Sequence, residues 1–281
     1  MPGQGQSPNA RSSAEARALE SFLAFWADAG VDAAFEDAPV DRLAERSRPA
    51  RASATVTPIT QAPPLGTPAA AGPDIAAPLA EARRLAAEAK DLTELAAAIA
   101  GFDGCGLKFE GARQAVFARG APDAPVMVIG EAPGAEEDQQ GAPFVGRAGK
   151  LLDKMLAAAG LEGRVFITNT VYWRPSGNRT PSPAEQLACS PFLERAIALV
   201  NPRFLLLAGG ASAKALLHRP EGILSLRGRW FDWRSADETQ SVPAMPTLHP
   251  AFLLRQPAAK KRAWADLLTL TERLDRPERP G

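Results

Sequence analysis

The sequence predicts an α/β fold, a three-layer α/β/α sandwich with a central, mostly parallel four-stranded sheet. Two observations predict this class. From Ala115 onward, short apolar runs alternate with segments of helical periodicity, and successive apolar runs start about 40 residues apart. This spacing leaves room for a helix between strands, and right-handed crossovers of this kind give a parallel sheet that is covered on both faces.

The residues before this alternation divide into three parts. Residues 13–36 carry apolar side chains at helical spacing, among them Phe22 and Trp26, so residues 1–36 are predicted to form a tail and an amphipathic helix. Residues 37–75 are rich in Pro, Ala, Ser and Thr without a sustained period, and we expect a flexible linker. An Ala/Leu/Glu pattern from Ile75 to Ile99 predicts one or two helices, which open the main domain, residues 76–281.

Four strands and three helices are predicted in the main domain. The strands are PVMVIG (125–130), RVFITNTV (164–171), RFLLLAGG (203–210) and VPAMPTLHP (242–250), and the helices are 146–159, 183–199 and 211–217. In sheets of this type, ligands bind beyond the carboxyl ends of the strands. The loops GEAPG and LHPAF and the strand-end residue Asn169 are therefore expected at a common rim.

The composition is that of a globular chain. Of the 281 residues, 46% are hydrophobic, which is enough for a sizeable core. No apolar run approaches the roughly 20 residues of a membrane span, and the N-terminus lacks the apolar segment of a signal peptide. We therefore expect a cytoplasmic protein without membrane contact. Cys105 and Cys189 lie far apart in the sequence, and a disulfide between them is the weaker interpretation.

The formal net charge of zero hides an asymmetry between the two halves of the chain. Residues 1–140 hold 12 Lys and Arg against 20 Asp and Glu, whereas residues 141–281 hold 20 against 12. The C-terminal half could therefore present a basic face to a polyanion. A solvated surface of mixed charge explains the same numbers equally well.

The stretch VIGEAPGAEEDQQGAPFVGRAG follows the first predicted strand, where phosphate-binding loops are found, but its residues are different. Neither Gly-Lys-Ser/Thr nor GxGxxG is present, and its carboxylates would repel phosphate. One interpretation is a Gly/Pro turn whose acids favour the start of a helix. The other is a pocket for a neutral polar ligand, where a carboxylate such as Glu131 could orient or activate a water.

Three further side chains near the expected rim suit a planar polar ligand, and each has a structural alternative. Phe144 could stack on such a ligand or fill the core. The Asn169 amide offers the donor and acceptor that read an imide edge, or it makes a local turn bond. His249 is one of two histidines in the chain, and a lone histidine is more often structural than functional.

Three long motifs resemble one family of DNA repair enzymes. GEAPGAEEDQQGAPFVGRAGKLL, TNTVYWRPSGNRTPSPAE and LHPAFLLRQP, in this order, strongly resemble the type-4 uracil-DNA glycosylases of the uracil-DNA glycosylase superfamily, over about residues 100–270. The resemblance implies a monofunctional enzyme that flips uracil out of DNA and hydrolyses its N-glycosidic bond, which leaves an abasic site. TVYWRPSGNRTPSPAEQ lacks the histidine of relatives that trap uracil covalently, so we expect turnover.

The resemblance also implies roles for individual residues. Phe144 would stack on the base, Asn169 would bond its Watson–Crick edge, and Glu131 would position the attacking water with Glu137 in support. The implied catalytic residues are Glu131, Glu137 and His249. The implied uracil-binding residues are Gly130, Glu131, Ala132, Phe144, Asn169 and His249.

DNA containing uracil, single- or double-stranded, is the implied partner. Cationic side chains near the motifs are candidates for phosphate contacts, and segment 250–256 resembles a loop that enters the duplex. The candidate DNA contacts are Arg147, Lys150, Arg174, Arg179, Leu253 and Arg255, with Arg227 and Arg229 as further cations. We expect a monomer, with the N-terminal helix as a docking element for a protein partner.

The resemblance breaks down at a metal site. Family members usually carry a [4Fe–4S] cluster on four cysteines. The matching positions here are Phe102, Cys105, Trp173 and Cys189, so two of the four ligands are missing. We therefore expect no metal site and no cofactor, with a [4Fe–4S] cluster of incomplete cysteine ligation as the alternative.

A catalytically silent uracil- or DNA-binding protein, or a polymerase-associated accessory protein, is the alternative function. The sequence argues against both because the carboxylates, Phe144, Asn169 and His249 are all present.

Overall fold

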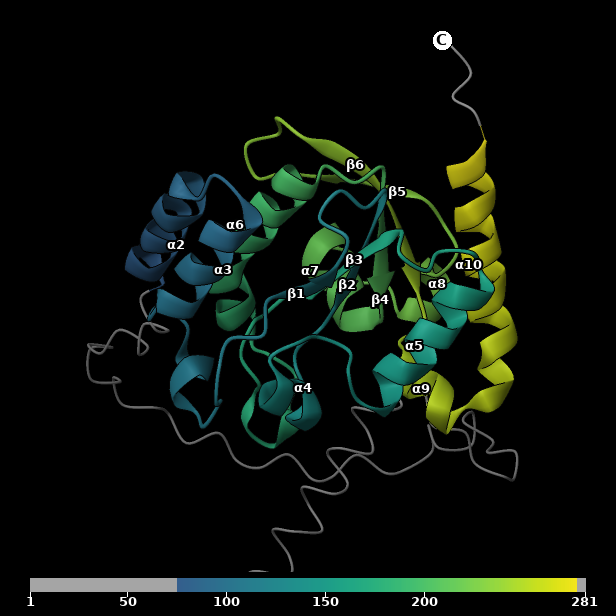
Figure 1. Cartoon of the computed structure of the whole chain (residues 1–281), viewed down its shortest axis with the longest axis horizontal. Coiled ribbons are helices and arrows are strands. Elements are labelled where there is room, and N and C mark those ends of the chain that lie inside the picture. The colour runs from purple at the N-terminus through teal and green to yellow at the C-terminus, as the bar shows by residue number, and fades with distance from the viewer. Residues whose placement is uncertain (1–74, 277–281) are drawn as a thin grey trace, which may run out of the picture.

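The computed structural model describes residues 75–276 (Figure 1). The predicted N-terminal helix and almost all of the predicted linker lie outside the described residues, as do residues 277–281. Within the described range, no helix is both long and apolar enough to cross a membrane.

The described strands form one six-stranded sheet in the order β1-β3-β2-β4-β6-β5. The four predicted strands are its centre and pair with one another in parallel. They are β2 (Val126–Gly130), β3 (Val165–Asn169), β4 (Phe204–Ala208) and β6 (Ser241–Thr247). The predicted number of strands was too small, because β1 (Ala118–Gly120) and β5 (Phe231–Arg234) add an antiparallel strand at each edge. Both are too short to show the two-residue period that reveals a strand.

Side chains of the central strands alternate between two hydrophobic cores, as the two-residue period of a strand requires. In β2, Met127 and Ile129 belong to one core, and Val126 and Val128 belong to the other. Because both faces are covered, β2, β3 and β4 are buried at every residue. This is why each of them reads as a continuous apolar run.

Different helices cover the two faces, which confirms the predicted three layers (Figure 1). The first core includes side chains of α2 (Ala76–Glu88), α3 (Leu92–Gly101), α6 (Pro183–Val200) and α7 (Gly210–Leu217). The second core is closed by α5 (Arg147–Ala158) and α10 (Lys260–Asp275). The shorter elements are η2 (Gly106–Phe109), α4 (Ala135–Gln140), η3 (Ser176–Asn178), α8 (Ile223–Leu226), α9 (Pro250–Arg255) and η4 (Pro257–Ala259).

The predicted helices correspond to α2, α3, α5, α6 and α7, and local chemistry fixes where α6 begins. Ser182 Oγ accepts from the Glu185 amide at 3.3 Å, and Glu185 Oε2 accepts from the Ser182 amide at 2.7 Å, a reciprocal N-terminal cap. Helix α10 was not predicted, although Leu267, Leu270 and Leu274 recur at helical spacing.

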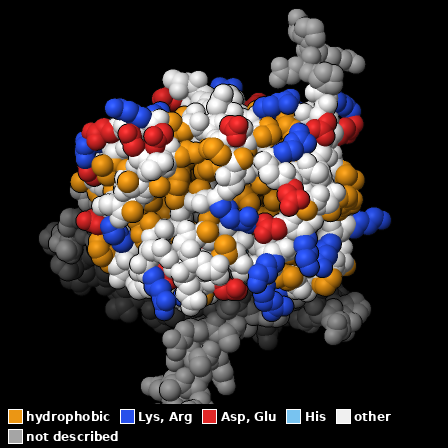
Figure 2. Space-filling view, in the orientation of Figure 1, with side chains coloured by type: hydrophobic (Ala, Val, Ile, Leu, Met, Phe, Trp, Pro, Cys, Tyr) orange, Lys and Arg blue, Asp and Glu red, His pale blue; other side chains and the backbone are white. Residues whose placement is uncertain are grey.

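Charge on the visible face of the molecule is mixed. Figure 2 shows acidic and basic side chains interspersed around hydrophobic ones on that face, without a patch of one sign. On this face, the surface agrees with the solvated alternative.

Candidate active site

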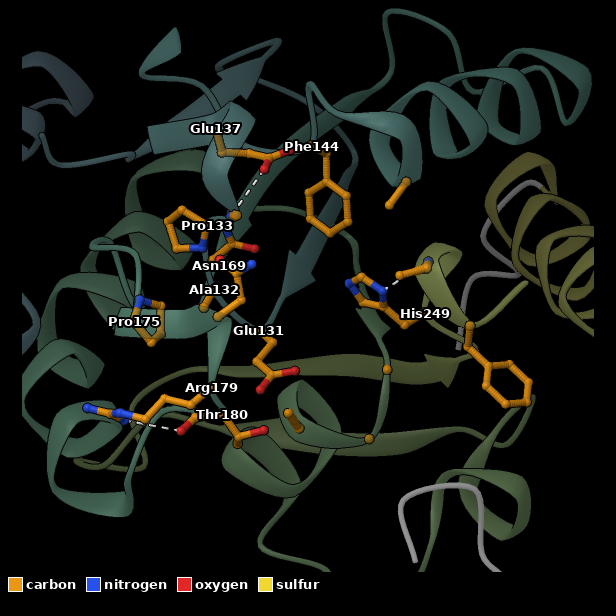
Figure 3. Close-up of a pocket in the computed structure, with 18 of the residues that line it drawn as sticks. Glu131, Ala132, Pro133, Glu137, Phe144, Asn169, Pro175, Arg179, Thr180 and His249 are labelled. Carbon is orange, nitrogen blue, oxygen red and sulfur yellow. Dashed lines mark hydrogen bonds between the residues drawn. The ribbon is translucent and has the colours of Figure 1, made fainter. Parts of the chain in front are cut away.

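Loops that follow β2, β3, β4 and β6 meet at one rim of the sheet and enclose a cavity of about 520 Å³. Backbone hydrogen bonds connect the ends of the strands there: the Thr170 amide donates to Gly130 O at 3.0 Å, and the Gly209 amide donates to Thr247 O at 2.9 Å. The predicted common rim is therefore formed. In Figure 3, Glu131, Phe144, Asn169 and His249 surround one central space.

Gly130, the last residue of β2, is where two of these side chains meet. A Cβ on Gly130 would lie 2.5 Å from Phe144 Cζ and would also collide with Asn169 Oδ1. Real Cβ atoms essentially never show such contacts, so any other residue here would displace the Phe144 ring or the Asn169 amide. The absent side chain lets Phe144 and Asn169 form adjoining walls of the cavity.

Asn169 ends β3 and is almost fully buried. Its Oδ1 has no hydrogen-bond partner among the described residues, so this oxygen does not make the local turn bond considered above. An unsatisfied buried acceptor costs about 1–3 kcal/mol. Because Asn169 lines the cavity, an N–H group of a bound ligand would remove that cost.

Phe144 contributes to the second core and also lines the cavity, so its core role is observed and its stacking on a ligand stays a prediction. Its backbone has φ 54°, a left-handed conformation that a bulky residue rarely adopts. The centroid of its ring lies 5.6 Å from that of His249, with 33° between the ring planes.

The two carboxylates of the first motif have different surroundings. Glu137 Oε1 accepts from the Val145 and Gly146 amides, both at 2.9 Å, and Oε2 accepts from the Gly134 amide at 3.1 Å. Glu137 thereby joins the loop after β2 to the loop that carries Phe144. Glu137 also lines the cavity, and its predicted support of catalysis stays a prediction.

The Glu131 carboxylate faces the central space (Figure 3). Its backbone oxygen accepts from Thr170 Oγ1 at 2.7 Å, which fixes the main chain of Glu131 against the end of β3. A carboxylate held on this rigid rim can orient a water or stabilise a nearby cation.

His249 caps the N-terminus of α9, where its Nδ1 accepts from the Ala251 amide at 3.1 Å. The proton of the neutral ring is therefore on Nε2, which is a donor. Burial, and to a smaller extent the positive charge of Arg255, lower the pKa of His249 to about 4, while the negative charge of Glu137 partly opposes the change. His249 is thus uncharged at neutral pH.

The predicted DNA contacts differ in their environments. Arg147 and Lys150 are exposed on the first turn of α5, and Arg179 and Arg255 line the cavity. Arg179 is also paired with Glu110 and Glu185, and Arg174 donates to Asn178 Oδ1 at 2.7 Å. The guanidinium of Arg229 lies 5.4 Å from the ring centroid of Phe231.

One predicted DNA contact is wrong, and one further candidate cation is engaged within the protein. Leu253 is fully buried in the first core and so cannot contact DNA, while its neighbour Leu254 is 37% exposed. Arg227 is bonded to the buried Asp266 and to the Arg262 carbonyl. The side chain of Arg227 therefore holds α10 in place.

A family model described as the uracil DNA glycosylase superfamily matches residues 117–268. The chain belongs to this superfamily. It is 41% identical over 183 residues to the type-4 uracil-DNA glycosylase of Pyrobaculum aerophilum, covering 63% of this chain and 91% of that relative. It is 39% identical to the proteins of the same name from Sulfurisphaera tokodaii (59% of this chain, 77% of the relative) and Thermotoga maritima (50% and 71%). Within the superfamily, the chain groups with the type-4 proteins.

The cluster expected of a type-4 uracil-DNA glycosylase does not fit the residues found at its site. Cys105 and Cys189 are buried and form no disulfide; the Cys189 thiol donates a hydrogen bond to Cys105 Sγ at 3.8 Å. Phe102 packs beside Trp173, with 6.5 Å between ring centroids, and neither side chain can bind iron. The hydrogen bond to Cys105, followed by burial, raises the pKa of the Cys189 thiol well above its usual value, whereas the same hydrogen bond lowers the pKa of Cys105. The thiolate that a metal requires is therefore disfavoured at Cys189.

No group of three or more potential metal ligands occurs among residues 75–276. The aromatic side chains fill the space instead, with the Phe102 and Phe192 rings 5.1 Å apart.

Proposed function

We propose that this chain excises uracil from DNA: it flips the base out, hydrolyses the N-glycosidic bond, releases uracil and leaves an abasic site. The single observation that carries the proposal is the buried, unpartnered Asn169 Oδ1 at a cavity walled by Phe144. Uracil offers a ring N–H for this oxygen and a flat face for the Phe144 ring. Cytosine has an acceptor at the same ring position, so Asn169 would reject it. The names of the type-4 relatives support the same activity.

The chemistry follows from the charges that develop as the bond breaks. Negative charge accumulates on the uracil ring, and the neutral His249 can donate from Nε2 to a uracil oxygen. Positive charge develops on the sugar, and the Glu131 carboxylate can stabilise this cation while holding water beside it. Glu137 keeps the Phe144 loop in place during these steps.

An excision assay tests the proposal. The full chain is incubated with uracil-containing single strands and with U·G and U·A duplexes, and abasic sites are then cleaved with alkali. Cleavage at the uracil position is expected for at least one substrate, and no product on any of them would overturn the proposal. The catalytically silent alternative has no observation in its favour.

The first prediction concerns the catalytic carboxylate. Glu131→Gln keeps the size of the side chain but removes the charge that stabilises the sugar cation, so single-turnover excision should fall at least about 100-fold. Gel-shift affinity for the same uracil DNA should stay close to wild type. Normal cleavage by Glu131→Gln would show that another group activates the water.

We also propose that the enzyme works without a [4Fe–4S] cluster. The replacement of two ligand positions by Phe102 and Trp173 supports this. Iron analysis and a visible spectrum of protein purified without air should show no stoichiometric iron, and a Cys105→Ala/Cys189→Ala double variant should still excise uracil. Stoichiometric iron, or loss of activity in a folded double variant, would contradict the proposal.

The organisation of the whole chain is proposed on the sequence alone. We propose that residues 76–281 are the catalytic domain, that the chain acts as a monomer, and that residues 1–36 dock a protein partner through the linker 37–75. Light scattering of the full chain measures the oligomeric state.

A further inference from the structure

We infer that Arg119 is a positioning residue for uracil excision: its guanidinium holds the Phe144 loop in the conformation that stacks on the flipped base. This inference rests on the proposed function. Arg119 lies outside the three motifs that carry the family resemblance, on the edge strand β1 that was not predicted.

The contacts of Arg119 converge on the loop from the side of the sheet. Its Nε donates to the Pro143 carbonyl at 2.7 Å, and its Nη2 donates to the Phe144 carbonyl at 3.0 Å. Asp153 on α5 accepts from the same Nη2 at 2.6 Å and fixes the guanidinium. Since β1 pairs with β3, the base of the Arg119 side chain is anchored to the sheet.

The loop needs such support because its backbone is strained. A left-handed φ at a residue such as Phe144 costs about 1–3 kcal/mol and persists only where the surroundings impose it. Helix α5 approaches so closely that a Cβ on Gly149 would overlap the Phe144 carbonyl. Any relaxation of the loop would therefore move the Phe144 ring relative to the cavity.

One cationic and one anionic side chain both bind the backbone of this loop. Arg119 bonds the carbonyls of residues 143 and 144, and Glu137 bonds the amides of residues 145 and 146. The guanidinium donates to carbonyl oxygens and the carboxylate accepts from amides, and such charge-assisted hydrogen bonds are stronger than neutral ones. Pro143 and Phe144 are buried, so water cannot readily replace Arg119. The Phe144 ring is thus held in place before a base binds.

The test compares full-length Arg119→Ala, Arg119→Lys and wild type, by inhibition with free uracil and by excision from a uracil-containing single strand. Loss of the two carbonyl bonds should raise the inhibition constant of uracil and lower kcat/KM, each by about tenfold. Affinity for uracil-free DNA should not change. Arg119→Lys should recover part of the loss, because an ammonium can reach a carbonyl but cannot bridge two in fixed geometry.

A double-mutant cycle separates positioning from a general structural role. If Arg119 acts through the Phe144 ring, Arg119→Ala should have little further effect in a Phe144→Ala background. Arg164→Ala is the matched control, because it breaks an exposed ion pair with Asp275, 2.9 Å long, and should leave uracil inhibition at the wild-type value.

Wild-type uracil inhibition in Arg119→Ala, or an undiminished effect in the Phe144→Ala background, would overturn the inference. If Arg119→Ala does not fold, Asp153→Asn is measured by the same criteria, because it removes the anchor of the guanidinium. Absence of excision by the wild type would instead overturn the proposed function.

Discussion

Gly130 shows how one residue shapes the site. It is flanked by the Asn169 amide and the Phe144 ring, both within the space that a methyl group would fill. In the sequence, Gly130 looks like the first residue of an ordinary strand-to-helix turn. Its steric role depends on residues 14 and 39 positions further along the chain.

Gly130→Ala should therefore lower excision by about 100-fold, because displacement of catalytic or binding groups by about 1 Å has effects of this size. Gly101→Ala is the control, since a Cβ there meets no atom within 4 Å. The measurement is kcat/KM on a uracil-containing single strand, together with a thermal melt of each variant. Equal activity of the two variants would refute the steric role of Gly130.

The pKa of His249 gives a prediction for pH. Because it is lowered from 6.5 to about 4, chiefly by burial, the folded protein binds fewer protons than the unfolded chain between these values. The contribution of His249 to stability is complete above pH 6.5 and is lost as the pH falls toward 4. Wild type should therefore have a lower free energy of unfolding at pH 5 than at pH 7. Urea unfolding should show that this decrease is smaller in His249→Asn.

The same pKa predicts that excision shows no inflection near pH 6.5, since His249 stays neutral there. A clear rise in kcat/KM with an apparent pKa near 6.5 that disappears in His249→Asn would contradict this assignment.

At the scale of elements, α9 shows that neighbouring residues of one motif have opposite environments. The helix starts at Pro250, directly after the His249 cap, and its turn directs Leu253 into the first core and Leu254 outward. The motif LHPAFLLRQP does not reveal this difference, because it contains two adjacent leucines and the helical phase depends on where the cap lies.

Leu253→Ala should lower the free energy of unfolding by about 2–5 kcal/mol, as expected for a buried leucine. Leu254→Ala should change it by less than about 0.5 kcal/mol. If Leu254 supports the opened duplex, Leu254→Ala should reduce excision from U·G and U·A duplexes more than from single strands. Urea unfolding and parallel excision assays on both variants provide the comparison, and equal destabilisation would contradict the assigned burial.

At the scale of the whole molecule, Asp266 connects the last helix to the sheet. Its carboxylate accepts from Thr247 Oγ1 of β6 at 2.7 Å and pairs with Arg227. Burial raises the pKa of Asp266, and Arg227 and Thr247 counteract that change. The same contacts engage Arg227 within the protein, and its role in DNA binding stays a prediction.

Asp266→Asn should lower the free energy of unfolding by about 2–3 kcal/mol, because it leaves the largely buried Arg227 without its anion. Asp275→Asn is the matched control: it removes the partner of Arg164 in an exposed pair, which typically contributes less than about 1 kcal/mol. Urea unfolding at neutral pH measures the loss of unfolding free energy in both variants. Equal losses would show that burial does not strengthen the Asp266 pair.

The sequence by itself determined the central parallel strands, most of the helices and the rim where the three motifs meet. This was possible because a strand buried on both faces reads as a continuous apolar run, and because loops after parallel strands converge at one edge. Only the tertiary structure decided that Glu137 bonds the backbone of the Phe144 loop, that Leu253 is buried while Arg227 is paired with Asp266, and that aromatic rings fill the space beside Cys105 and Cys189. These outcomes depend on hydrogen bonds and packing between residues distant in sequence, and no local pattern records them.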